Sequence, residues 1–128
     1  MRILGIDFGS KRVGIALSDS SASIGQPYKV LQNTKTLLQD VVSIITKEEV
    51  KEIVVGESKN FKGQDNVIMD AVRTFKKELE DATKLPVHYE PEFMSSEQAQ
   101  HFQGKNEFHD ASAAAIILQS YLDRIKNI

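Results

Sequence analysis

Hydrophobic positions along the chain follow two periods, and their order predicts the secondary structure. Short runs rich in β-branched and aliphatic residues predict strands, and longer segments with an apolar stripe at helical spacing predict helices. Brief turns separate the first runs, which favours antiparallel pairing, whereas strands alternate with helices later, which favours parallel pairing. The sequence therefore predicts an α/β protein with a mixed central β-sheet flanked by α-helices. Strands are expected at residues 3–8, 12–18, 23–31, 52–56 and 86–90, and helices at 34–49, 64–81, 95–102 and 110–126.

Single residues refine these elements. Pro27 cannot donate a hydrogen bond to a central ladder, so the third strand is expected at an edge or with a bulge. Asn33 or Thr34 can cap the first helix, because their side-chain oxygens accept hydrogen bonds from free backbone N–H groups. The run at 52–56 is apolar enough for a buried parallel strand.

Length and composition limit the class of protein. The 128 residues are expected to form a single domain, 1–128, large enough for a real core but too small for two lobes. The apolar runs are too short for a membrane span, and no signal peptide is expected before the first strand. The chain has no cysteine, which excludes disulfides and thiolate metal sites and is compatible with a reducing cytoplasm.

The charge balance argues against binding nucleic acid through a general basic surface. The net charge is −2 and the sequence pI is about 5.9, whereas proteins that bind in this way are usually basic. Phosphate contacts would have to come from local clusters, with modest and salt-sensitive affinity. Lys11 and Arg12 in the first turn are the best candidates, followed by Lys59 and Lys62, although all four can also be solvated loop residues.

Asp7 is the first candidate for chemistry, because it ends an apolar strand where an unpaired carboxylate is costly to bury. A metal ion, or a phosphate held through a metal, would compensate it. Alternatively, its carboxylate accepts hydrogen bonds from the backbone of the turn. Actin-like ATPases and sugar kinases use a similar Asp-x-Gly hairpin around a nucleotide phosphate, and RNase H-like nucleases place a metal-binding aspartate on the first strand. The short chain argues against the two-lobed ATPases.

Three further acids occupy suitable positions. Glu57 and Glu92 follow strands whose carboxyl ends converge at one edge of a parallel sheet, where ligands bind, and Asp110 opens the last helix. Each also has a simpler role: Asp110 can cap its helix, and both glutamates can be solvated loop acids. The three histidines lack the spacing of a shared metal site and are expected at the surface or in loops.

Two motifs carry a family resemblance. The string GIDFGSKRVGIALSD at residues 5–19 resembles the start of the YqgF family, the Holliday-junction-resolvase-like proteins described as pre-16S rRNA nucleases. Asp110-Ala-Ser-Ala-Ala resembles the late Asp-x-x-Ala-Ala motif of that family. Aligning back from Ala99 places Glu92 on the family's glutamate and Ser95 and Ser96 on its hydroxyl pair. The flanking Asp and Arg of the family are replaced by Pro91 and Phe93.

The resemblance implies an RNase H-like fold, with Asp7, Glu92 and Asp110 as the catalytic acids and as ligands of Mg²⁺ or Mn²⁺. Lys11, Arg12, Lys59 and Lys62 would hold the phosphate backbone; Ser95 and Ser96 would contact it or cap the following helix. It implies a cytoplasmic nuclease, active as a monomer or homodimer, that processes the 5′ end of pre-16S rRNA, with RNA favoured over DNA. The alternatives are a Holliday junction resolvase acting on branched DNA, or a degenerate module that binds nucleic acid or ribosome-assembly factors without cutting.

Overall fold

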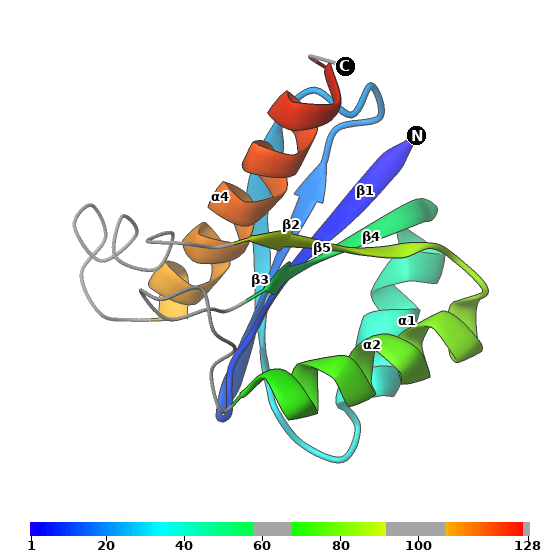
Figure 1. Ribbon diagram of the computed structural model, residues 1–128, viewed down its shortest axis with the longest axis vertical. Coiled ribbons are helices and arrows are strands. Elements are labelled where there is room, and N and C mark those ends of the chain that lie inside the picture. The colour runs from blue at the N-terminus through cyan, green and yellow to red at the C-terminus, as the bar shows by residue number, and fades with distance from the viewer. Residues whose placement is uncertain (58–67, 92–106, 127–128) are drawn as a thin grey trace.

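The structure, a computed structural model, describes residues 1–57, 68–91 and 107–126, with side chains in the last segment described from Ala111 onward (Figure 1). Helices lie on both sides of a five-stranded sheet. In chain order the elements are β1 (Arg2–Phe8), β2 (Arg12–Ser18), β3 (Gly25–Gln32), α1 (Leu37–Lys47), β4 (Val50–Glu57), α2 (Met69–Thr83), β5 (Val87–Pro91) and α4 (Glu107–Lys126).

The sheet has the predicted mixture of pairings. Its strand order is β3-β2-β1-β4-β5, with β2 antiparallel to both β1 and β3 and with parallel pairs β1–β4 and β4–β5. The carboxyl ends of β1, β4 and β5 therefore lie at one edge, together with the turn that leads from β1 into β2. Pro27 lies in the edge strand β3, beside a register shift between Ile15 and Ala16, which confirms both parts of the expectation for it.

Several predicted boundaries are wrong for identifiable reasons. The third strand begins at Gly25 because the Asp19 carboxylate accepts hydrogen bonds from the N–H groups of Ser23 and Ile24, at 2.7 and 3.1 Å, and holds them in a loop. Helix α1 begins at Leu37, and its cap position, Thr36, makes no side-chain cap hydrogen bond. The expected short helix at 95–102 lies outside the described residues.

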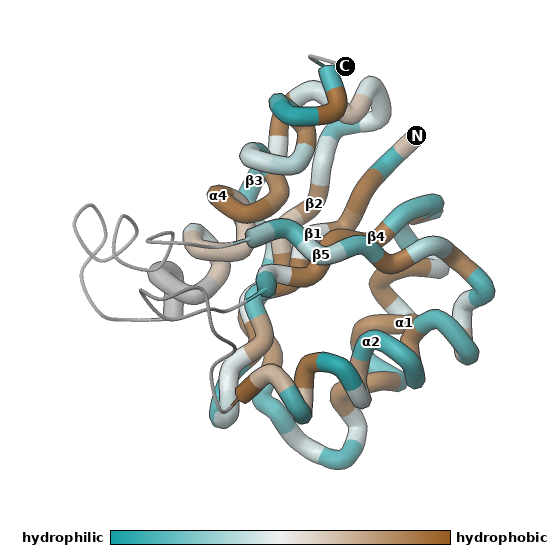
Figure 2. The backbone as a smooth tube through the Cα atoms, in the orientation of Figure 1, coloured by the Kyte–Doolittle hydropathy of each residue, from teal (hydrophilic) through white to brown (hydrophobic). Residues whose placement is uncertain are grey.

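Each face of the sheet buries its own hydrophobic cluster, and the alternation of side chains along β1 separates the two. Leu4 and Ile6 belong to the larger cluster under α1 and α2, whereas Ile3 joins the cluster under α4. Apolar colouring runs along the inner strands in Figure 2, and much of α2 is hydrophilic. Each fully buried Leu or Ile stabilises the fold by roughly 1.5–3 kcal/mol. Among the described residues, no helix combines the length and hydrophobicity needed to cross a membrane.

Helix α4 packs unusually close to the sheet because glycines face it. A Cβ added to Gly5 would lie 2.8 Å from Cβ of Leu118 and 3.2 Å from the carbonyl oxygen of Ala114. Gly25 of β3 also faces Leu118, with the side-chain tip of that leucine 3.0 Å from an added Cβ. Figure 1 shows the amino end of α4 at the end of the molecule where β1 finishes, so the two elements run in opposite directions.

Candidate active site

The predicted convergence of strand ends is confirmed for the described strands. Asp7 is the second-to-last residue of β1, and its Cα partner on β2 is Gly14. Glu57, the final residue of β4, pairs with Pro91, the final residue of β5. These strand ends share one edge of the sheet, and Glu92, which follows Pro91 in sequence, lies outside the described residues.

Asp7 is half-buried and lies on the face of the sheet that α4 covers. This follows from the alternation of side chains, because Ile3 packs under α4 and Gly5 approaches Leu118. Gly14, directly opposite on β2, has no side chain, so β2 itself brings no side chain against the Asp7 carboxylate at this position.

The turn after β1 depends on Gly9. A Cβ at this position would lie 2.5 Å from the carbonyl oxygen of Arg12, closer than real Cβ contacts permit. The glycine-containing turn predicted from the sequence is therefore required by backbone contact. The turn reverses the chain directly after β1, so Lys11 and Arg12 lie at the same edge of the sheet as Asp7.

The first turn of α4 lies at the level of Asp7. Ala114 lies beside Gly5, and Asp110 precedes Ala114 by four residues, about 6 Å along the helix axis. Asp7 lies two strand residues beyond Gly5 in the same direction, about 6.6 Å. The backbone of Asp110 is thus close to the end of β1. Because α4 begins at Glu107, the expectation that Asp110 opens and caps this helix is wrong.

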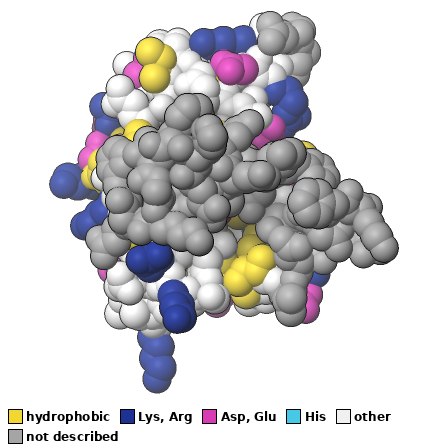
Figure 3. Space-filling view, turned by 90° about the vertical axis from the view of Figure 1, so that its left-hand side faces the viewer, with side chains coloured by type: hydrophobic (Ala, Val, Ile, Leu, Met, Phe, Trp, Pro, Cys, Tyr) yellow, Lys and Arg dark blue, Asp and Glu magenta, His cyan; other side chains and the backbone are white. Residues whose placement is uncertain are grey.

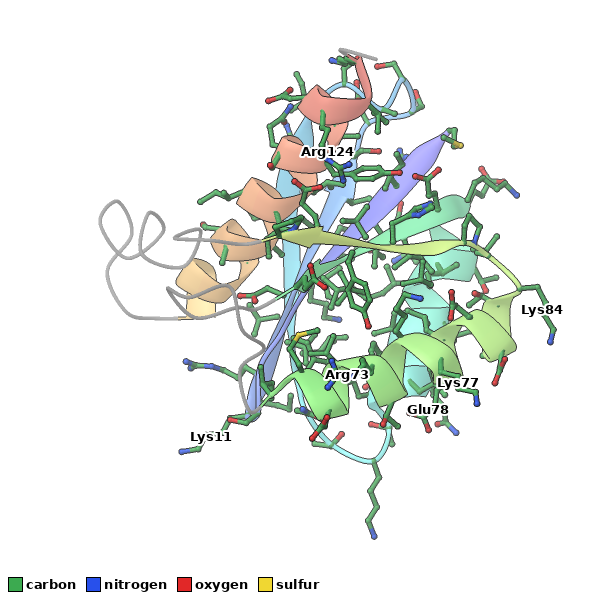
Figure 4. The ribbon with its side chains drawn as sticks, viewed as in Figure 1. Lys11, Arg73, Lys77, Glu78, Lys84 and Arg124 are labelled. Carbon is green, nitrogen blue, oxygen red and sulfur yellow. The ribbon has the colours of Figure 1, made fainter. Side chains whose placement is uncertain are left out.

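Lys11 and Arg12 are both exposed beside this edge. Figure 4 shows Lys11 at the tip of the β1–β2 turn, directed away from the body of the molecule. Figure 3, which views the molecule from the left of Figure 1, shows Lys and Arg side chains toward the lower end, where this turn lies. Lys59, Lys62, Ser95 and Ser96, the other predicted contacts to nucleic acid, lie outside the described residues.

Asn33 holds this turn in place, although the sequence suggested a helix cap for it. Its Nδ2 donates a hydrogen bond of 2.8 Å to the carbonyl oxygen of Gly9, and its backbone N–H donates one of 2.9 Å to the carbonyl of Lys11. The capping prediction for Asn33 is therefore wrong. No local sequence signal marks this role, since the partners are more than twenty residues away.

Glu90 is a buried acid with its own partners. It is 5% exposed; Ser120 Oγ donates to its Oε2 at 2.9 Å, and Arg124 Nε donates to its Oε1 at 3.0 Å. Arg124 also contacts Oε1 through its terminal nitrogen. This ion pair ties β5 to α4, the two elements that lead to Glu92 and carry Asp110.

His88 takes part in a second cluster toward the beginning of β4 and β5. Its ring stacks on Tyr121 with centroids 5.7 Å apart, and its Nε2 lies 3.6 Å from Glu52. Burial, followed by the hydrogen bond to Glu52, raises the pKa of Tyr121 to about 12. His88 is 45% exposed, as expected for a surface histidine. The other two histidines lie where side chains are not described.

The described side chains alone do not assemble a metal centre: among them, no three His, Asp or Glu residues gather closely enough to hold an ion. Glu92 and the side chain of Asp110 fall outside that set. Two described carboxylates lie near the edge on adjacent parallel strands: Asp7 on the face that α4 covers, and Glu57, which the alternation along β4 places with Val55 on the opposite face. Carboxylate oxygens suit hard divalent cations such as Mg²⁺ and Mn²⁺, so the residues present fit such an ion.

Comparison with protein families identifies the chain. The family model RuvX, described as Holliday junction resolvase, matches residues 1–124. The chain belongs to the RuvX family. This confirms the YqgF resemblance drawn from the first and last motifs. The match extends across β1 and most of α4, the two elements that carry Asp7 and Asp110.

Known relatives of this RuvX chain match it over nearly their full length. The protein of Maridesulfovibrio salexigens, named "Putative pre-16S rRNA nuclease", is 36% identical over 134 residues, covering 97% of this chain and 99% of the relative. A protein with the same name from Caldanaerobacter subterraneus is 36% identical over 139 residues, covering 99% of each. Both relatives therefore correspond to the whole RuvX chain rather than to a part of it.

A solved structure shows the fold. T. thermophilus RuvC in complex with a Holliday junction substrate matches with a TM-score of 0.65 and 15% identity, covering 98% of the RuvX chain and 96% of RuvC. The expected RNase H-like fold is confirmed, with its mixed five-stranded sheet and flanking helices.

Proposed function

We propose that this RuvX chain is a nuclease that hydrolyses phosphodiester bonds in 5′-end processing of pre-16S rRNA, during ribosome biogenesis in the cytoplasm. One observation carries the proposal: Asp7 ends the central strand β1 beside the ends of β4 and β5 and the first turn of α4. Ligands of α/β proteins bind at such an edge. The names of the full-length relatives support rRNA as the substrate.

Asp7, Glu92 and Asp110 are the proposed catalytic acids and ligands of Mg²⁺ or Mn²⁺. Three carboxylates close together repel one another, so a divalent cation stabilises their joint ionisation. Gly14, the partner of Asp7 on β2, adds no side chain to this cluster. When bound, the metal would lower the pKa of the attacking water and stabilise charge on the leaving oxygen. Glu57 lies at the same edge, but the alternation along β4 places its side chain on the opposite face from Asp7, so it is not included among the ligands.

The protein's own cations orient the substrate strand. Lys11 and Arg12 project from a turn that Asn33 holds rigidly beside Asp7, so they neutralise phosphates next to the bond that is cut. Lys59 and Lys62 extend this contact in the proposal, and Ser95 and Ser96 donate hydrogen bonds to phosphate oxygens. A protein with net charge −2 depends on these few contacts, so its affinity should fall steeply with salt.

A second candidate substrate is a four-way DNA junction, favoured by the family description and by the similarity to RuvC. The same acids and metal would serve this reaction. Symmetric cutting of a junction needs two active centres, so this alternative requires a homodimer, whereas processing of an RNA end does not.

The deciding experiment is a gel assay with three labelled substrates: a pre-16S rRNA leader, single-stranded DNA and a four-way junction. Wild type is compared with Asp7→Asn in Mn²⁺ and in chelator. Asp81→Asn, an exposed position on α2, is the matched control because it makes the same charge change away from the site. We expect metal-dependent cutting of the RNA by wild type and by Asp81→Asn, and none by Asp7→Asn.

Each other result has a definite meaning. Preferential cutting of the junction would replace RNA processing with resolution. Cutting that persists in Asp7→Asn would mean that another centre or a contaminant is responsible. A folded wild type that binds RNA but cuts none of the substrates would refute the nuclease and leave a binding module, in which ribosome-assembly factors become the expected partners.

A further inference from the structure

A groove opens on the opposite face of the sheet from Asp7, between the amino-terminal turns of α1 and α2. Its volume is about 550 Å³, within the range of about 300–1,000 Å³ typical of small-molecule sites. The floor is apolar and includes Phe8, Phe75 and Leu38. The rim is polar and includes the hydroxyls of Thr34 and Thr74. Such a groove suits a flat, apolar group with polar edges.

The groove and the proposed catalytic centre share one strand end. Phe8 immediately follows Asp7, so the two side chains lie on opposite faces at the same edge of the sheet. Asn33, which holds the Lys11 turn, also lines the groove. A nucleic acid strand crossing this edge would therefore meet the catalytic acid on one face and the groove on the other.

Phe8 provides an aromatic surface within the groove. Its ring lies against that of Phe75, with centroids 5.3 Å apart and a tilt of 41°. Phe75 is 5% exposed, so its ring is held in the core and supports the ring of Phe8. Phe8 is half-buried, so part of its own surface stays accessible. Unpaired bases stack on aromatic side chains of this kind.

The charges at the rim of the groove favour a neutral base over a phosphate group as the ligand. Lys35, Asp70 and Glu78 are the charged residues in the described lining of the groove, and Asp70 is paired with Arg73, whose nitrogen lies 2.7 Å from the Asp70 carboxylate. Figure 4 shows Arg73 and Glu78 on α2. Lys35 is the one cation lining the groove as described, against two acids, so a phosphate group is disfavoured there. The Thr74 hydroxyl already donates to the carbonyl of Asp70, and Asn33 Nδ2 to that of Gly9, so the oxygens of these side chains are left to accept hydrogen bonds from the edge of a neutral base.

We propose that the groove holds one unpaired nucleobase of the RNA strand, close to the bond that the Asp7 centre cuts. This inference rests on the nuclease proposal for its biological role, but base binding itself can be measured without cleavage. The sugar and phosphate of the bound nucleotide would pass the β1–β2 turn, where Lys11 lies. The groove would thereby select an unpaired nucleotide at the cleavage site, which a continuous duplex cannot supply.

Binding is tested with a single-stranded RNA spanning the 5′ end of 16S rRNA, in Ca²⁺ and in the Asp7→Asn background to prevent cutting. One nucleotide at a time is replaced by an abasic residue or by the fluorescent base 2-aminopurine. We expect a single position at which the abasic residue weakens binding about 5- to 150-fold, the range expected for one stacked base. The same position should show quenched 2-aminopurine fluorescence.

Two pairs of variants locate that base. Ala71 is exposed and lines the groove, so Ala71→Leu fills it from the rim; Ala82, exposed on the same helix outside the groove, gives the matched control Ala82→Leu. Phe8→Leu removes the ring, and Phe8→Tyr restores it. Ala71→Leu and Phe8→Leu should abolish the abasic effect and the quenching, whereas Ala82→Leu and Phe8→Tyr should retain both.

Uniform abasic effects along the RNA, or a position effect that survives in both Ala71→Leu and Phe8→Leu, would overturn the groove as a base site. The abasic scan of the Asp7→Asn protein, whose groove is unchanged, gives the first of these results even if a groove variant does not fold. Failure of the nuclease proposal looks different: wild type would not cut in Mn²⁺, yet a position effect lost in Ala71→Leu would still establish the base site. Cutting with no position effect would keep the nuclease and reject the groove.

Discussion

Gly5→Ala tests how closely α4 packs on the sheet. The added Cβ would lie 2.8 Å from Cβ of Leu118, and ordinary contact begins at 3.4 Å, so the helix must move by about 0.6 Å. A Cβ cannot rotate away, and the carbonyl oxygen of Ala114, at 3.2 Å, is also backbone. Overpacking of this kind costs about 1–3 kcal/mol, partly offset by about 0.4–1 kcal/mol from the more restricted unfolded chain. We expect a net loss of about 1–2 kcal/mol.

Urea unfolding followed by circular dichroism measures this loss, and Gly25→Ala is the matched control. Its added Cβ lies farther from Leu118, at 3.0 Å from Cγ and Cδ2 and 3.3 Å from Cβ, and the two nearer atoms can move by rotation of the side chain. We expect Gly25→Ala to cost less than Gly5→Ala. Equal unfolding midpoints for wild type and Gly5→Ala, or a larger loss in Gly25→Ala, would refute the close approach of α4.

The same substitution should affect activity beyond its effect on stability. Moving α4 shifts the first turn, which carries Asp110, relative to Asp7. A displacement of about 1 Å in a catalytic group can cost on the order of 100-fold in rate. At a temperature where Gly5→Ala is fully folded, we expect cleavage to be at least several-fold slower than in Gly25→Ala. Equal rates would mean that the spacing between β1 and α4 does not determine catalysis.

Three further predictions follow from named contacts. Arg124→Met should lower the unfolding free energy by about 1–3 kcal/mol in urea, because buried Glu90 then keeps Ser120 alone of its described partners, whereas Arg124→Lys should cost less. Hydrogen bonds from Ser21, then Ser23 and Ile24, lower the pKa of Asp19 to about 2. The stabilisation of the fold by this carboxylate is therefore complete above about pH 3.9 and is lost as the pH falls toward about 2. Between these pH values, the midpoint of urea unfolding should fall less in Asp19→Asn than in wild type. Mn²⁺ should raise the melting temperature of wild type and of Asp81→Asn, but not of Asp7→Asn; equal shifts in all three would place the ion elsewhere.

Local pattern was sufficient to predict the five strands and the end of the strand that carries Asp7. Alternating apolar residues and the Gly9 turn act over neighbouring positions, so their effect is visible in sequence. Pro27 was equally informative, because a missing N–H restricts any strand that contains it. The motifs at the two ends of the chain also predicted the family correctly.

Tertiary contacts determined what the pattern did not reveal. Asn33 is a residue type that often caps helices, but its side chain instead donates a hydrogen bond to the carbonyl of Gly9, which is far away in sequence. Glu90 is buried because Ser120 and Arg124 reach it from α4, about thirty residues later. The start of α4 was misplaced at Asp110 because an aspartate before an alanine-rich run resembles a cap. The proposed roles of Glu92 and of the Asp110 side chain remain predictions.

The edge strand β3 has a consequence for how copies of the chain can meet. Pro27 has no N–H to donate, the register shift beside it distorts the ladder, and Lys29 is exposed nearby. Natural sheets use these features to prevent strands of separate molecules from pairing. A second copy docked along β3 would form an interrupted ladder beside a lysine charge. Any homodimer is therefore expected to associate through another surface, and concentrated solutions should resist fibrillar aggregation that begins at this strand.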